Sequence, residues 1–304
     1  MSMILENVAL ENVAAVQKEE QGVIGHLTWY SVSEHLISRD DLRKKLLDAG
    51  LDEGWMPNEI RVSDAFRRAT KDVEIRKNPT SQANVFENFL VREVYSDQKM
   101  VQRNIVRETV DQKGKRLSYD GQAAILILDK ETKGIGIVSQ NAKAGELARE
   151  ADKLFRIYCS NYSAQTLRVM IMNILKSMSP TPVRPNGGVY FVPSAHSDQL
   201  SRLCKFVGSL EKGEMYKVPL INTDDNQKML RNKLEDHFRN IIQECDEALN
   251  GELKKGQVKV LLEEAKRVVS DFGHYKAIVT QDVEKLEEYI DQLRERIALV
   301  VRSM

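Results

Sequence analysis

The sequence predicts an α+β protein built from three parts. These are an N-terminal strand with two helices, a central antiparallel sheet with split βαβ (ferredoxin-like) topology, and a long antiparallel helical hairpin (coiled coil) at the C-terminus. Residues 86–128 contain three runs rich in Val, Ile and Tyr with turns between them, as expected for a meander. Residues 121–221 follow the order strand, helix, strand, strand, helix, strand. The last third repeats apolar residues at alternating spacings of three and four, which is typical of a helical seam.

Changes of pattern suggest where these parts begin and end. The turn-rich stretch KNPTSQAN, at residues 77–84, separates helical from strand periodicity. We expect a tail or short helix at 1–22, a strand and helix lobe at 23–78, a sheet domain at 79–223 and the hairpin at 224–304.

Composition favours a soluble globular protein, with 42% hydrophobic and 30% charged residues and a formal net charge of zero. No apolar run approaches the ~18 residues that a membrane helix needs, and the N-terminus lacks the basic start of a secretory signal. We therefore expect a cytoplasmic chain with no membrane partner. Cys159, Cys204 and Cys245 lie far apart in apolar contexts, which indicates reduced core thiols.

The N-terminal lobe has local signals for each of its elements. VIGHLTWYSV, after Gly22, has the composition of a strand. A helix is expected from Ser38 to Ala49, because Ser38 and Asp41 have capping-box spacing and Gly50 can end it. A second helix is expected from Ser63 to Lys71, with Ser63 as its cap.

The central region combines a meander with two helices. Ala123 to Leu128 are apolar on both faces, so this strand is expected at the centre of the sheet. Asn186-Gly187-Gly188 between two short apolar runs is a strong hairpin signal. The remaining elements are expected helices at 142–158, 163–178 and 194–210 and a last strand at 215–221. A winged-helix fold with 163–178 as recognition helix is an alternative, but that helix offers only Arg168 and Lys176 as basic residues.

The C-terminal seam runs through one long predicted helix with a single stutter between Tyr275 and Val283. This helix is expected to fold back on a preceding one that ends at Asn250-Gly251. We predict that the seam serves oligomerisation, although a hairpin can also satisfy it within one chain. Its residues are Leu261, Ala265, Val268, Phe272, Val279, Val283, Leu286, Ile290, Leu293 and Ile297.

The sequence holds no strong catalytic or metal-binding motif. There is no phosphate-binding loop, no dinucleotide fingerprint and no pairing of His and Cys at metal-ligand spacing, so neither a cofactor nor a structural metal is expected. The best catalytic candidates are Asp129, Asp224 and Asp225, which follow predicted strands and would suit a two-metal nuclease or polymerase site. Turn formation and helix capping are the more common uses of aspartate at such positions.

Basic residues concentrate between positions 61 and 118, where 13 Lys and Arg face 8 Asp and Glu. Two groups there are candidates for nucleic-acid binding, since phosphates attract clustered cations. Trp29, Tyr30 and Trp55 could add base stacking, although core packing is their commoner use. The candidate cations are Arg61, Arg67, Arg68, Lys71, Arg76 and Lys77 in the first group, and Lys113, Lys115 and Arg116 in the second.

Residues 26–71, HLTWYSVSEHLISRDDLRKKLLDAGLDEGWMPNEIRVSDAFRRATK, and 184–196, RPNGGVYFVPSAH, resemble an uncharacterised family of bacteriophage, plasmid and mobile-element proteins. The resemblance covers most of the chain but implies no activity and no site residues. It implies a mobile-element setting, and the host cytoplasm if a phage encodes the chain.

Together these observations favour binding and self-association over catalysis. The first hypothesis is a self-associating protein of a phage or mobile element that organises nucleic acid during replication or maintenance. The second is an inhibitor or decoy that binds a host defence or replication factor, which near-zero net charge favours. A metal-dependent nuclease or polymerase-like enzyme is the third.

Overall fold

The computed structural model describes residues 22–184, 187–276, 278–279 and 283–303. The protein is α+β, and the chain divides into two compact units. Unit 2 comprises Leu36–Leu42 and Pro57–Ser163, and unit 1 comprises the rest. The four predicted segments do not map one to one onto these units, because residues 79–223 are shared between them. Apart from Gly22, the expected N-terminal tail lies outside the described residues.

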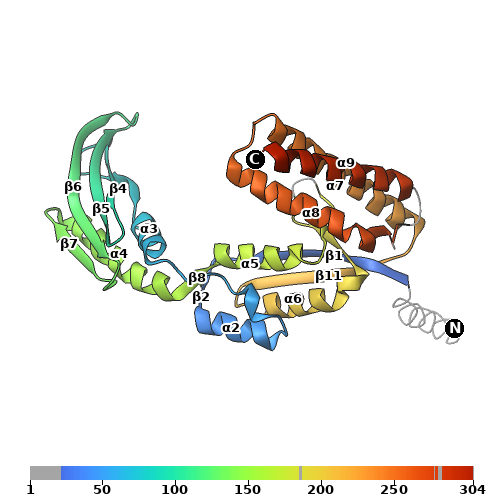
Figure 1. Cartoon of the computed structure of the whole chain (residues 1–304). Coiled ribbons are helices and arrows are strands. Elements are labelled where there is room, and N and C mark those ends of the chain that lie inside the picture. The colour runs from blue at the N-terminus through green and yellow to red at the C-terminus, as the bar shows by residue number, and fades with distance from the viewer. Residues whose placement is uncertain (1–21, 185–186, 277, 280–282, 304) are drawn as a thin grey trace, which may run out of the picture. The chain divides into compact units, whose positions relative to one another are not determined.

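Unit 2 is built around an antiparallel sheet with the order β3-β4-β5-β6-β7. Figure 1 shows how strongly β4, β5 and β6 curve, with α3 and α4 against one face. Short strands β2 (Leu36–Ser38) and β8 (Asn161–Ser163) pair separately. The sheet and helix bounds are β3 (Ile75–Pro79), β4 (Val85–Ser96), β5 (Met100–Asp111), β6 (Arg116–Asp129), β7 (Ile135–Ser139), α3 (Val62–Asp72) and α4 (Ala142–Ser160). The predicted meander is thus present.

Unit 1 contains an antiparallel sheet with the order β11-β1-β10-β9. The helices α5 and α6 contact each other and β1, and Tyr30 and His26 of β1 bond to them, so both helices cover one face. The bounds are β1 (Val23–Val32), α2 (Arg39–Asp48), η1 (Glu53–Trp55), α5 (Ala164–Lys176), β9 (Thr181–Pro182), β10 (Tyr190–Pro193), η2 (Ser194–His196), α6 (Ser197–Ser209) and β11 (Gly213–Ile221).

The opposite face of this sheet packs on the C-terminal helices. Ile24, Phe191 and Leu220 share one hydrophobic core with α7 (Asp224–Leu249), α8 (Lys255–Lys276) and α9 (Val283–Ser303). Because apolar side chains from both layers enter that core, the helices and the sheet stabilise each other. Among the described residues, every helix is too short or too polar to span a lipid bilayer.

Two predictions about connectivity are corrected. The strand at Ala123–Leu128, expected to open a split βαβ sheet with the strands near 190 and 215, belongs to β6 in unit 2. Its expected place beside β10 and β11 is taken by β1. The long helix from Leu261 to Val300 is also wrong, because α8 ends at Lys276. Ile278 and Val279 leave the helix, and both are buried in the core.

Predictions that rest on neighbouring residues were more accurate than predictions of which distant strands pair. The Ser38 hydroxyl accepts from the Asp41 amide at 3.1 Å, which confirms Ser38 as the helix cap, and it donates to the Asp41 carboxylate at 2.8 Å. Ser63 does not cap α3, which begins one residue earlier after Arg61 without a side-chain cap. Gly187 and Gly188 have φ angles of 70° and 86° between β9 and β10, as the hairpin prediction requires.

Candidate nucleic-acid interface

Basic side chains of α3 are exposed to solvent because the apolar side of this helix is buried inside unit 2. Ala65, Phe66 and Ala69 are buried against the sheet and α4, and the ring of Phe66 meets that of Phe155 edge-on at 6.0 Å. Residues three and four apart share a helix face, so this burial turns the intervening side chains outward. Arg67 and Lys71, one turn apart, are accordingly exposed.

A buried polar network fixes α3 on the sheet. Arg103 of β5, only 8% exposed, donates to the Thr70 hydroxyl at 2.9 Å and to the Arg67 carbonyl at 3.3 Å. Its guanidinium also forms an ion pair with Glu93 at 2.8 Å, and the Thr70 hydroxyl donates to the Phe66 carbonyl. A buried guanidinium with several partners holds its neighbours in one geometry. The exposed face of α3 therefore stands on a rigid base.

The described residues pair four of the nine candidate cations with acids. Arg67 pairs with Asp64, and Arg76 lies 3.9 Å from Glu74. Arg68 lies 3.9 Å from Asp72 and packs over the ring of Tyr158. Arg116 pairs with Glu108 at 2.7 Å and lies over the ring of Tyr119. Within the part of the chain that the structure describes, the other five are exposed and form no ion pair. They are Arg61, Lys71, Lys77, Lys113 and Lys115, here called the unpaired cations.

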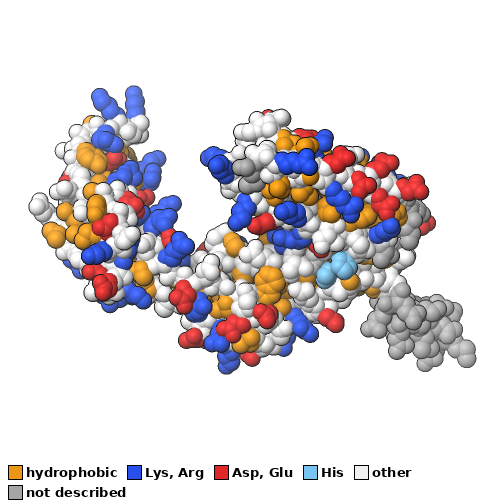
Figure 2. Space-filling model, viewed as in Figure 1, with side chains coloured by type: hydrophobic (Ala, Val, Ile, Leu, Met, Phe, Trp, Pro, Cys, Tyr) orange, Lys and Arg blue, Asp and Glu red, His pale blue; other side chains and the backbone are white. Residues whose placement is uncertain are grey.

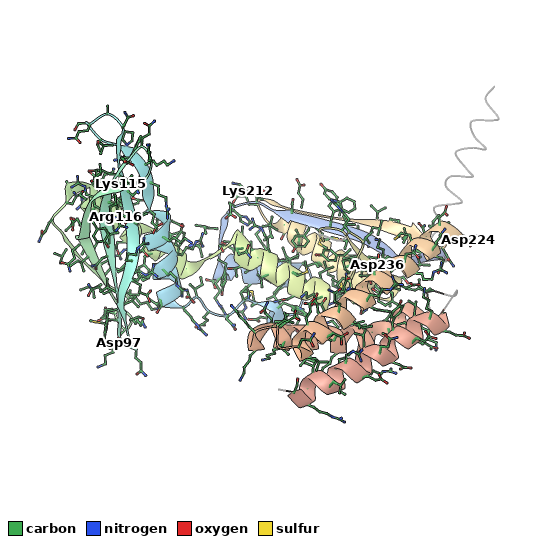
Figure 3. The ribbon with its side chains drawn as sticks, turned by 90° about the horizontal axis from the view of Figure 1, so that it is seen from above. Asp97, Lys115, Arg116, Lys212, Asp224 and Asp236 are labelled. Atoms are coloured by element: carbon green, nitrogen blue, oxygen red, sulfur yellow. The ribbon has the colours of Figure 1, made fainter. Side chains whose placement is uncertain are left out.

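The exit of the first basic group, Arg76 and Lys77 on β3, lies toward the same end of the unit 2 sheet as the second group. The helix α3 itself contacts Arg103 through Thr70, near the other end of β5. The register aligns Pro79 with Phe86, Phe86 with Val110, and Val110 with Arg116. Neighbouring strands are about 4.8 Å apart, so the end of β3 and the tip of the β5–β6 hairpin are separated by roughly 14 Å. Figure 3 labels Lys115 and Arg116 at this hairpin and Asp97 at the β4–β5 turn, at the other end.

The hairpin tip owes its shape to Asp111. Its carboxylate accepts from the backbone amides of Lys113 at 2.9 Å and Lys115 at 2.8 Å, while Gly114 takes a φ of 82°. A carboxylate used in this way closes the turn and leaves the lysine side chains directed into solvent. Figure 2 shows Lys and Arg side chains (blue) gathering over this unit.

Of the three candidate acids, Asp129 has an identifiable structural role in a turn. Asp129 accepts from the amides of Glu131 and Thr132 in the β6–β7 turn, and these bonds, the one from Thr132 first, lower the pKa of its carboxyl. Asp224 and Asp225 lie in the first turn of α7, in the other unit (Figure 3), and the cap there is the Thr223 hydroxyl. No group of three or more His, Cys, Asp or Glu within the described ranges is arranged to hold a metal ion.

The aromatic and thiol candidates divide between core and surface. Tyr30 is turned inward, where burial raises the pKa of its hydroxyl, and Trp55 is half-buried. Trp29 is 39% exposed beside Tyr216, with ring centroids 5.9 Å apart. All three cysteines are free, as predicted, and burial raises the pKa of Cys245 to about 11.

Sequence reasoning missed the Arg103 network, because the contacts of Arg103 with Glu93 and Thr70 depend on strand register and helix docking. It also missed the pairing of Arg116 with Glu108 across a hairpin. The alternation of the flanking strands is the only sequence signal that bears on either contact.

Comparison with known proteins adds a family and nothing about activity. Residues 23–302 match the model of a protein family described as "Family of unknown function (DUF6744)". No curated protein and no solved structure matches the chain.

Proposed function

Since the chain belongs to this family, whose description assigns no activity, we propose a function from geometry alone: the protein binds nucleic acid through unit 2 and is not an enzyme. The observation that carries the proposal is the set of unpaired cations, which lie at the two ends of α3, on β3 and at the β5–β6 hairpin tip. Exposed cations without acidic partners release counterions when they meet phosphates, which is the main source of sequence-independent affinity.

The proposal includes a fold assignment for unit 1. The strand order β11-β1-β10-β9, with α5 preceding β9 and α6 between β10 and β11, supports a split βαβ, ferredoxin-like module. On this interpretation, residues 36–163 are an insertion between the first strand and first helix of that module. A mobile-element origin, a cytoplasmic location and a role in replication or maintenance remain part of the same proposal.

Self-association is the second part of the proposal. All the predicted seam residues except Val283 pack inside one chain, in the core shared with the sheet. A dimer would therefore have to bury other apolar side chains, and Val260, Leu299 and Val301 are 55%, 44% and 49% exposed on α8 and α9. Light scattering of the full chain across a concentration series tests this part, and a monomeric mass throughout would remove it.

The test of nucleic-acid binding compares two sets of lysines on unit 2. The triple lysine variant changes Lys71, Lys113 and Lys115 to Gln. The control variant changes Lys143 and Lys153 to Gln; these lie on α4 and already pair with Glu146 and Glu150. We expect fluorescence anisotropy with labelled DNA at low salt to show weaker binding for the triple lysine variant and near-normal binding for the control.

Two results would reject the proposal. One is the absence of any affinity for single- or double-stranded DNA or RNA at low salt, and the other is an equal loss in both variants. Adding Mg²⁺ or Mn²⁺ to the same samples tests the metal-dependent enzyme, because cleavage of the labelled strand that is lost on changing Asp129 or Asp224 to Asn would support it.

An exposed apolar patch favours a protein partner as the second candidate function. Trp29, Tyr216 and Val218 lie on one face of β1 and β11 and are 39%, 53% and 45% exposed. Exposed aromatic residues beside aliphatic ones are frequent anchors of protein interfaces. This patch supports the hypothesis of an inhibitor or decoy that binds a host protein, with Trp29 as the residue to change.

A further inference from the structure

Unit 1 contains a cavity of about 240 Å³ that no part of the proposed function uses. It lies where the end of α5 and the β9 segment meet α7 and α8. Its apolar lining is contributed by Met172, Pro180, Pro182, Leu234, Phe238 and Val268. A cavity of about 150 Å³ admits one benzene ring, so this one has room for a ring or branched chain together with a short polar group.

Four charged side chains reach the same cavity, and two of them act electrostatically on histidines: Glu264 on His237 and Asp271 on His196. Lys176 comes from α5, and Glu264, Arg267 and Asp271 come from one face of α8, at spacings of three and four. All four are half-buried, and in the described part of the chain none forms a hydrogen bond or ion pair. Half-buried charges are normally paired, so four together beside an apolar surface are typical of a ligand site.

Charges elsewhere on these helices show the contrast. Glu235 pairs with Arg239 at 3.2 Å and with Lys285 at 2.9 Å, and Asp246 pairs with Arg296 at 2.6 Å. Glu235 and Asp246, which are buried and half-buried away from the cavity, are thus paired, whereas in the part of the chain described the half-buried charges at the cavity are not.

One wall of the cavity is held rigidly. Tyr275 is fully buried, and its hydroxyl donates to the Ser179 carbonyl and accepts from the Thr181 hydroxyl at 2.7 Å. These bonds fasten α8 to the β9 segment. A preformed pocket loses less entropy when a ligand enters than a flexible one does.

We propose that this cavity binds a small zwitterion of amino-acid size with an aromatic or branched aliphatic side chain. The apolar lining takes the side chain, Arg267 and Lys176 take the carboxylate, and Glu264 and Asp271 take the ammonium group. Arginine suits a carboxylate because its planar fork donates two parallel hydrogen bonds. His237 also lines the cavity, and burial lowers its pKa, so it stays neutral near pH 7 and the four charges balance.

The test uses isothermal titration calorimetry with L-phenylalanine, L-leucine and two truncated probes. Phenylpropionate lacks the ammonium group of phenylalanine, and phenethylamine lacks its carboxylate. We expect at least one amino acid to bind at least about tenfold more tightly than both truncated probes, since each lost charged contact is worth about 10-fold or more.

Matched substitutions on α8 assign the charges. Arg267→Gln should weaken binding of the amino acid by about 10- to 100-fold. Glu264→Gln should instead reduce the preference for phenylalanine over phenylpropionate, and the double variant with Glu264→Gln and Asp271→Asn should erase it. The controls are Lys266→Gln and Glu263→Gln, whose exposed side chains are the chain neighbours of Arg267 and Glu264 and lie outside the cavity lining.

Three results would overturn the inference. They are no heat of binding from either amino acid at about 10 mM, binding of a truncated probe as tight as that of the tighter-binding amino acid, and equal effects of the cavity and control variants. DNA binding is measured separately and involves unit 2, so its failure would leave this inference standing.

Discussion

Replacing Tyr275 with Phe should destabilise unit 1, because one buried hydroxyl serves two other buried groups. Tyr275 is 5% exposed, Ser179 is 6% exposed and Thr181 is 1% exposed. The Tyr275 hydroxyl donates to the Ser179 carbonyl and accepts from Thr181 at 2.7 Å. The Phe ring would fill the same space, so the change isolates the hydrogen bonds from packing.

The expected magnitude follows from counting the groups left without partners. A buried polar group that loses its hydrogen-bond partner costs about 1–3 kcal/mol of stability. Tyr275→Phe leaves two such groups without their partner, the Ser179 carbonyl and the Thr181 hydroxyl. The deleted hydroxyl no longer needs to leave water on folding, which offsets part of that cost. We therefore expect a loss of about 2 kcal/mol in the free energy of unfolding.

Urea unfolding of the full chain measures this loss, and Thr181→Val is the matched comparison. Thr181→Val removes only the second hydrogen bond and keeps the bond from Tyr275 to Ser179, so it should cost about 1 kcal/mol. The double variant should lose less than the sum of the two, because the substitutions share one bond. A Tyr275→Phe variant within about 0.5 kcal/mol of the wild type would refute the reasoning.

Three further predictions concern binding, pH and packing. If the five unpaired cations each meet one phosphate, log affinity for duplex DNA should fall with log salt at a slope of about −4.5. The triple lysine variant keeps two of these cations, so its slope in anisotropy titrations should be about −1.8. Equal slopes for the two proteins would contradict this prediction. Burial lowers the pKa of His237 below its usual 6.5. As the pH falls, His237 is therefore protonated at a higher pH in the unfolded chain than in the folded one. Stability should thus be steady above pH 6.5 and fall below it, as urea midpoints would show, and His237→Gln should lessen the fall. Gly25→Ala would place a Cβ 2.4 Å from the Val192 carbonyl oxygen and should cost about 3 kcal/mol, whereas Gly208→Ala in α6, with open space around it, should be neutral or stabilising by urea unfolding.

The elements that could be predicted are those decided by neighbouring residues. The Ser38 cap needs the four residues from Ser38 to Asp41, and the turn at Gly187 and Gly188 needs two. Both are therefore visible in the printed sequence and present in the structure.

The assignment of strands to sheets could not be predicted in the same way. The apolar run at Ala123–Leu128 suits any strand covered on both faces, whichever sheet contains it. Its actual partners are β5 and β7, with Ile105 and Ser139 opposite Ala124, while β1 pairs with β11 some 190 residues later. Such pairing depends on the packing of whole layers, which local periodicity does not encode.

The candidate interface was predictable in its residues and not in their availability. Counting cations locates Arg67 and Lys71 equally well. Only the structure shows that Arg67 pairs with Asp64 on its own helix while Lys71 has no acidic partner among the described residues. This difference decides which substitution tests binding, because an arginine already paired with an acid contributes less to phosphate affinity.

The fate of the C-terminal seam changes what the helices can be used for. A stutter can be absorbed by unwinding a supercoil or by ending the helix, and the sequence pattern is the same in both cases. Here α8 ends at Lys276, and the side chains of Ile278 and Val279 are buried in the core that α7, α8 and α9 share. Because that core also contains Ile24 and Phe191 from the sheet, removing the helices would expose apolar sheet residues as well as helical ones. The C-terminal third is therefore a structural layer of unit 1, and any assembly of several copies has to form through side chains that a single chain leaves exposed.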